Sequence, residues 1–180
     1  MQPRVLPLAA VSILLLAGPV LCQRPGTIEV GAMARFTDYD NSLSFNSTVG
    51  IGGRLGVFLP GGLSIEGDIS RTSSDRPGAS VKYTPMHAFL LYNYRLGESS
   101  LFAGGGYVHN KYDYGGGSDT TDSGIAVTVG LRYHLRNMVK LRLDLNEDFI
   151  PSPANKAPAQ SFNGNLGMEL GVSFLIGFRK

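Results

Sequence analysis

The end of the chain carries the pattern that most constrains its fold. Every second residue is apolar over this stretch: Leu166, Met168, Leu170, Val172, Phe174, Ile176 and Phe178. An amphipathic helix would place apolar residues three and four positions apart, whereas alternate residues of a β-strand point to opposite faces of a sheet. The pattern therefore predicts a two-faced strand and excludes a helix.

The same alternation recurs along the rest of the chain. It is clear in the segments 28–37, 49–59, 63–70, 125–135 and 139–146. Two more segments, 81–95 and 101–109, are strand-like without a clean polar face, and the first contains Pro85, which suits a strand end or a bulge near a rim. Together with the C-terminal segment, the sequence predicts eight strands.

The connections between these segments alternate in length. Residues 60–62, 96–100 and 136–138 are short turns, whereas 38–47, 72–80, 110–123 and 148–163 are longer and rich in Gly, Ser, Asp, Asn and Pro. Up-and-down order places all short turns, with both termini, at one end. We therefore predict an all-β, eight-stranded antiparallel up-and-down transmembrane β-barrel in one domain.

The first 22 residues resemble an export signal. Arg4 precedes the apolar stretch Val5–Ala17, and Val20 and Cys22 stand three and one residues before the expected cleavage site. The barrel domain would then be residues 23–180. Cys22 is the only cysteine, so no disulfide or cysteine-based site is expected after cleavage. With 16 Lys and Arg against 14 Asp and Glu, bulk charge argues against nucleic-acid binding.

The polar face of the strands decides which way the apolar face points. It is mostly Gly, Ser, Thr and Asn, which suit a narrow interior better than a solvated surface. Five acids and five bases share this face, and charges buried there would have to pair. We predict an interior polar network made by Glu29, Arg35, Arg54, Glu66, Asp68, Arg132, Lys140, Arg142, Asp144 and Glu169.

A soluble barrel offers an alternative. With the apolar face inside, the chain would be a periplasmic, lipocalin-like carrier of an apolar ligand. The polar face would then be solvated, and its balance of charges would carry no meaning.

The whole pattern resembles the OmpA-like eight-stranded outer-membrane barrel family, without its peptidoglycan-binding domain. The most specific part is the stretch 171–178, where Phe174, Ile176 and Phe178 look like the assembly signal of outer-membrane proteins. Arg179 and Lys180 follow, whereas the family signal usually ends on the aromatic residue. The resemblance implies a Gram-negative outer membrane, contact with its lipid and with the barrel-assembly machinery, and long loops at the cell surface.

Signals for catalysis and metal binding are weak. The histidines His87, His109 and His134 are not spaced from a serine as in lipid-modifying barrel enzymes, and no Gly-rich cluster continues into a phosphate-binding motif. The segment that starts with Asp38 and Asp40 resembles the beginning of a calcium-binding loop. The glycine and the glutamate that such a loop requires do not follow at the right spacing. We expect no catalytic residue, cofactor site or metal site, with a lipid-modifying enzyme as the second alternative.

The leading functional hypothesis is a monomeric barrel with a structural or surface-interaction, adhesion-like role. Eight strands leave an interior that side chains fill, and the predicted charge network would plug it. Partners would be lipid and an extracellular molecule held by the long loops.

The signal sequence gives a direct test. Cleavage after Cys22 predicts that the exported protein begins at Gln23, which its intact mass will report. Retention of residues 1–22, or a diacylated Cys22 as the first residue, would contradict this prediction.

Overall fold

The computed structural model describes residues 24–39, 46–76, 79–114, 119–136, 138–151, 153 and 162–177. The predicted signal peptide, residues 1–22, lies outside these ranges, as does Phe178. Within the described ranges no helix is long and apolar enough to cross a membrane.

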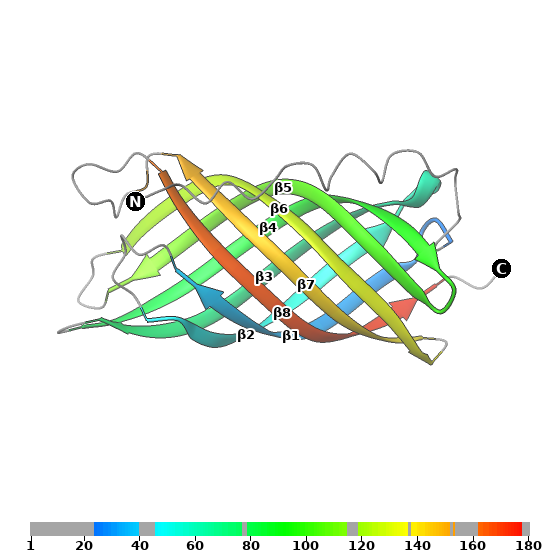
Figure 1. Ribbon diagram of the computed structural model, residues 1–180, viewed down its shortest axis with the longest axis horizontal. Coiled ribbons are helices and arrows are strands. Elements are labelled where there is room, and N and C mark those ends of the chain that lie inside the picture. Colours follow the sequence, from blue (N-terminus) through cyan, green and yellow to red (C-terminus); the bar gives the residue numbers. More distant parts are fainter. Residues whose placement is uncertain are drawn as a thin grey trace.

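Antiparallel strands in sequential order form one closed barrel (Figure 1). Its elements are β1 (Ile28–Asp38), β2 (Thr48–Phe58), the short 3-10 turn η4 (Pro60–Gly62), β3 (Leu63–Arg76), β4 (Ala79–Leu96), β5 (Ser99–Asp113), β6 (Asp119–Arg136), β7 (Val139–Pro151) and β8 (Phe162–Ile176). The predicted eight-stranded up-and-down barrel is confirmed.

Closure depends on the first and last strands. β1 pairs with β8 from Ile28 opposite Ile176 to Asp38 opposite Leu166. Each strand therefore has a hydrogen-bonded neighbour on both sides, and no complete strand is left as an edge. A closed sheet of this kind can satisfy its backbone groups inside hydrocarbon, which an open sheet cannot do.

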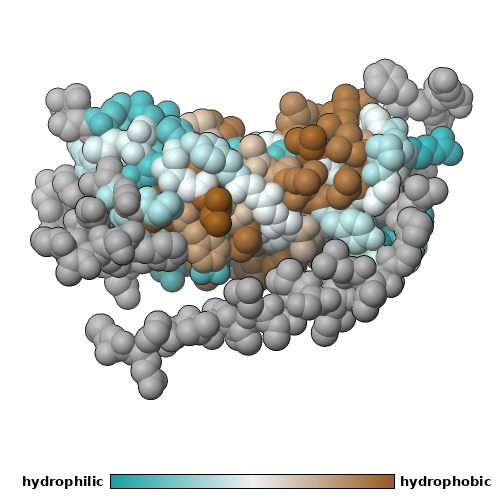
Figure 2. Space-filling model, turned by 90° about the horizontal axis from the view of Figure 1, so that it is seen from above, coloured by the Kyte–Doolittle hydropathy of each residue, from teal (hydrophilic) through white to brown (hydrophobic). Residues whose placement is uncertain are grey.

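The apolar phase of the strands points outward. Ile51 and Val49 are 78% and 63% exposed, whereas Arg35 on the polar phase of β1 is 1% exposed. Figure 2 shows apolar side chains gathered around the middle of the barrel and hydrophilic ones at its ends. The outside therefore matches the apolar band of a membrane barrel, and the alternative of a soluble carrier with an apolar lumen is wrong.

Strands β3 to β7 all extend beyond the segments that the sequence pattern predicted. β3 continues to Arg76, β4 already begins at Ala79, and β5 and β6 pair as far as Asp113 opposite Asp119. Much of the predicted loops 72–80 and 110–123 is therefore strand. Inside this extension of β3–β6, aromatic and aliphatic side chains form a buried cluster of Tyr39, Val81, Tyr83 and Tyr112. This packing keeps polar segments paired well beyond the apolar band.

Pro85 lies in the middle of β4 rather than at a strand end or in a bulge, so that prediction is wrong. Pairing between β3 and β4 stops at Ile69 opposite Met86 and resumes at Thr72 opposite Tyr83 in the same register. Proline has no N–H to donate to the ladder. The barrel accommodates it by interrupting one ladder locally.

The β4–β5 wall explains why the sequence did not reveal its faces. Here the interior is itself apolar, with a buried cluster of Phe89, Leu91, Phe102, Val108, Ala126 and Ile150. The two strands also approach closely, since a Cβ on Gly104 or Gly106 would collide with the carbonyl oxygens of Leu90 and Ala88. Glycine is required where backbones come this close.

Candidate functional site

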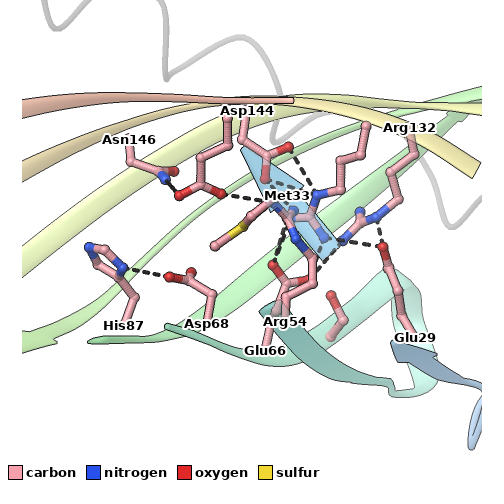
Figure 3. A network of polar contacts seen from close by, with 12 residues as sticks. Glu29, Met33, Arg54, Glu66, Asp68, His87, Arg132, Asp144 and Asn146 are labelled. Atoms are coloured by element: carbon pink, nitrogen blue, oxygen red, sulfur yellow. Dashed lines mark hydrogen bonds and ion pairs between the residues drawn. The ribbon is translucent and has the colours of Figure 1, made fainter. Parts of the chain in front are cut away.

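The interior of the barrel holds a dense set of charged side chains (Figure 3). All ten residues of the predicted polar network are buried, with exposures of 7% or less. They come from β1 (Glu29, Arg35), β2 (Arg54), β3 (Glu66, Asp68), β6 (Arg132), β7 (Lys140, Arg142, Asp144) and β8 (Glu169). The network therefore draws on strands from almost the whole circumference.

Arg142 makes the largest number of these contacts. Its Nη1 and Nη2 donate to the two carboxylate oxygens of Glu66 at 2.6 Å each, a bidentate pair. Its Nε donates to Asp144 at 2.9 Å, and Nη1 lies 3.3 Å from Glu29. The planar guanidinium fits this geometry because it presents donors in a fixed fork.

Arg54 on β2 connects its strand to the opposite side of the barrel. Its guanidinium donates to Asp144 and, at 2.8 Å, to Glu169, and it lies 2.8 Å from the sulfur of Met33. These contacts join β2 to β7 and β8, which are not its hydrogen-bonded neighbours in the sheet. The ion pairs therefore brace the barrel across its lumen, in addition to the backbone ladders around it.

Arg132 closes the end of the network nearer the short turns. It lies 3.0 Å from Glu29 and 3.2 Å from Glu66, and it also donates to Asn93. The guanidinium carbons of Arg132 and Arg142 lie 4.1 and 4.3 Å from the ring centroid of Phe102, so β5 contributes a cation–π platform.

Two titratable members of the network, His87 and Asp148, were missed by the sequence analysis. His87 bridges Asp68 at 2.8 Å and Asp148 at 3.0 Å through its two ring nitrogens, and Asp148 also lies 3.7 Å from Arg35. A ring that donates to two carboxylates carries both protons and a positive charge. Asp148 continues the polar phase of β7 beyond Asn146, where the predicted strand ended. Extending the alternation by one step would have found it.

The remaining predicted residues are placed as follows. Arg35 pairs with Glu169 at 2.8 Å, and Asn146 donates to the same carboxylate at 2.8 Å. Lys140 is fully buried at the periphery of the network. Phe174 and Ile176 of the predicted assembly signal face outward and are about half exposed, and their recognition by assembly machinery stays a prediction.

Aromatic rings fill the lumen on the side of the long hairpins. The Tyr83 ring lies 5.2 Å from that of Tyr39 and 5.1 Å from that of Tyr112. The Tyr83 hydroxyl donates to Asn110 at 2.9 Å. This tyrosine layer and the charge network occupy successive levels of the interior, which leaves the lumen filled by side chains as expected for eight strands.

One histidine and serine meet on the outer surface. Nδ1 of His109 lies 2.9 Å from the hydroxyl of Ser123, its partner across β5 and β6. A serine nucleophile also needs a group that orients the imidazole and donors for an oxyanion. The nearest outward neighbours on β4 and β5 are Met86, Tyr107 and Lys111, and none is a carboxylate. The pair therefore resembles an ordinary cross-strand contact.

The described residues contain no group of three or more His, Cys, Asp or Glu that could hold a metal ion. In the interior, Glu29, Glu66, Asp144 and Glu169 are engaged by guanidinium groups, and Asp68 and Asp148 by the His87 ring. Chemically, the arrangement is suited to holding strands together and to excluding a continuous water path.

Comparison with known proteins is consistent with this architecture. The family model described as "Outer membrane protein beta-barrel domain" matches residues 8–169. No curated protein matches the sequence significantly.

Several solved outer-membrane barrels have similar structures at low sequence identity. Neisserial surface protein A has a TM-score of 0.62 and 18% identity over 82% of this chain and 95% of its own. OprG of Pseudomonas aeruginosa has a TM-score of 0.61 and 12% identity over 88% and 100%. Ail of Yersinia pestis, in complex with the heparin analogue sucrose octasulfate, has a TM-score of 0.52 and 14% identity over 85% and 100%. These likenesses concern the fold.

Adjacent residues on β7 test the assignment of the two faces. Arg142→Ala should lower the free energy of unfolding by about 3 to 5 kcal/mol, because Glu66 loses its bidentate partner and Asp144 loses one of its two arginines inside the barrel. Leu143→Arg on the outer face should cost about 2 to 4 kcal/mol near the membrane midplane. Reversible urea unfolding in lipid vesicles measures both changes.

The matched control for this test is Arg95→Ala. Arg95 is exposed beside the short turn between β4 and β5, where its Nε donates to the carbonyl of Gly97 at 3.1 Å. Its loss should change stability by less than about 0.5 kcal/mol. A harmless Arg142→Ala would show that the ion pairs do not brace the barrel.

Proposed function

The chain belongs to the family of outer membrane protein beta-barrel domains, and from this premise we propose that it is a sealed barrel with a structural and surface-interaction role. The protein is a β-barrel of the bacterial outer membrane. The observation that supports a role other than transport is the filled lumen, where the arginines pair with carboxylates on opposite walls.

The sealed lumen disfavours diffusion of polar solutes. A solute would have to separate the bidentate contact between Arg142 and Glu66 and displace the Arg132 guanidinium that lies over the Phe102 ring. Breaking a buried ion pair leaves uncompensated charge and is costly. The interior therefore supports mechanical bracing rather than conduction.

The extension of β3–β6 supports contact with other molecules. Its outward side chains are polar, including Ser73, Ser80, Lys82 and Thr121, and its interior is fixed by the buried tyrosines. A rigid, polar platform beyond the apolar band is suited to presenting hairpins at the cell surface. Ail, which shares the fold, has been crystallised with a heparin analogue, and we propose an adhesion-like role for this chain as well.

The proposal includes the steps that deliver the barrel. Residues 1–22 would direct export and be removed, Phe174 and Ile176 would present the outward pattern that assembly machinery binds, and the folded barrel would be a monomer with its long hairpins outside. We do not propose a lipid-modifying enzyme, because the described outward neighbours of His109 on β4 and β5 include no carboxylate to orient its ring.

Planar-bilayer recordings test the sealed interior. The purified monomer should give no large, steady conductance, because paired arginines and carboxylates fill the lumen. A general porin measured in the same bilayers serves as the positive control. Stable, porin-sized openings from a verified monomer would contradict the proposal, whereas brief, small openings are compatible with rearranging ion pairs.

Adhesion of whole cells tests the role of the extension. Cells that display the protein should be retained on surfaces coated with heparin or with extracellular-matrix protein more than cells without it. Replacing residues 111–121 by a two-residue turn that joins Asn110 to Asp122 should lower retention several-fold and leave the amount of folded barrel unchanged.

The control for this deletion is Ser73→Ala together with Thr121→Ala in the full-length chain, which keeps the hairpin but removes two outward hydroxyls. Unchanged retention with this control would assign the effect to the hairpin as a whole. Equal retention of cells with and without the protein on both coatings would refute the interaction role and leave only the structural one.

A further inference from the structure

The outer wall of β8, β1, β2 and β3 is hollowed. A broad, open depression with a volume of about 970 Å³ lies on this face. The hollow arises because Ala32, Ala34 and Gly53 are small outward residues. Larger apolar side chains stand around them, including Leu141, Ile51, Ile69, Leu170 and Val172.

Arg71 stands at one end of this hollow. It lies on the outward phase of β3, directly opposite Ile51, and lines both the large hollow and a smaller one of about 390 Å³ beside Val49 and Ser73. None of the ion pairs between described side chains involves Arg71, unlike the arginines of the interior. Its charge therefore has no acidic partner in the described part of the barrel.

The depth of Arg71 decides which group can meet that charge. It follows Leu63, at the short-turn end of β3, by eight residues. At about 3.3 Å per residue and a tilt of about 40°, that places it roughly 20 Å up an apolar band about 25 Å tall. Arg71 is thus close to the boundary between hydrocarbon and head groups on the side of the long hairpins.

Two lysines on the same side of the barrel have acidic neighbours of their own, since Lys82 on β4 stands opposite Asp113 on β5 and Lys111 pairs with Asp119. Lys111 on β5 lies 2.7 Å from Asp119, and this contact raises the pKa of Lys111, while the charge of Arg71 acts in the opposite direction. Of Lys111 and Arg71, only Lys111 lies within ion-pairing distance of a described carboxylate. The positive charge of Arg71 could therefore be compensated by an anion from outside the described part of the barrel.

We propose that Arg71 and the hollow below it form a binding site for a phosphorylated lipid of the outer leaflet. The guanidinium would hold a lipid phosphate, the anion that Arg recognises with two parallel hydrogen bonds, and one acyl chain would fill the trough over Ala32, Ala34 and Gly53. This inference rests on the proposed orientation, with the long hairpins outside. A lipid is favoured over a second barrel because the apolar trough ends on an uncompensated cation.

Native mass spectrometry of the folded, full-length barrel in detergent tests this site. The probes are diphosphorylated lipid A and the same lipid A after enzymatic removal of its phosphates. The barrel should bind one molecule of the phosphorylated lipid at least about tenfold more tightly than the dephosphorylated one. Arg71→Ala should lower the affinity for the phosphorylated lipid about tenfold. Ala34→Leu, which fills the hollow, should lower the affinity for both lipids.

Two control variants separate the site from general effects. Arg95→Ala removes an exposed arginine at the opposite end of the barrel, and Ala88→Leu adds the same bulk to an outward alanine of β4 outside the hollow. Both should bind lipid as the parent does. A heat-modifiable gel shift confirms that each variant is folded, and Gly53→Ala offers a second trough variant because a Cβ there meets only the Gly31 carbonyl at 3.5 Å.

Four outcomes would overturn the proposal. They are equal affinity for the two lipids, equal losses with Arg71→Ala and Arg95→Ala, displacement of the lipid by millimolar inorganic phosphate, and a dimer that Ala34→Leu abolishes. The last would assign the hollow to a second copy. Loss of adhesion without loss of lipid binding would count against the surface-interaction role alone, so the two proposals fail separately.

Discussion

The need to satisfy backbone hydrogen bonds in hydrocarbon governs this structure. Lipid tails offer neither donors nor acceptors, so a sheet inside the membrane must close on itself. The pairing of β1 with β8 provides that closure and brings the two ends of the barrel domain together. Closure with eight strands leaves a narrow lumen, and the narrow lumen in turn decides which side chains can fill it.

Part of the filling is ionic, and this has a structural effect. Arg54 and Arg142 reach carboxylates on strands that are distant around the circumference, so the lumen is cross-linked in addition to the sheet. Buried charges are costly when alone and tolerable only in mutual contact. The network therefore favours one register of the whole barrel, since a shift of one residue would turn its members toward lipid.

The sequence predicted the fold because alternation is a local property. β7 and β8 alternate cleanly, whereas β4 and β5 do not, because Phe89, Leu91 and Phe102 make the interior apolar at that wall. The sequence placed ten charges on the inner face but could not pair them. Arg54 and Glu169 are 115 positions apart, and only the stagger of the closed sheet brings them together. His87 was missed because its strand has no polar phase to mark it.

The interruption beside Pro85 gives the molecule a mechanical asymmetry. On the short-turn side of Pro85, ion pairs across the lumen brace the strands. On the side of the long hairpins, the extension depends on its backbone hydrogen bonds and on the tyrosine packing. A shear force on the outer hairpins therefore concentrates where the β3–β4 ladder lacks two consecutive pairs. Bending of the extension at this point would leave the ion-paired wall on the short-turn side in place.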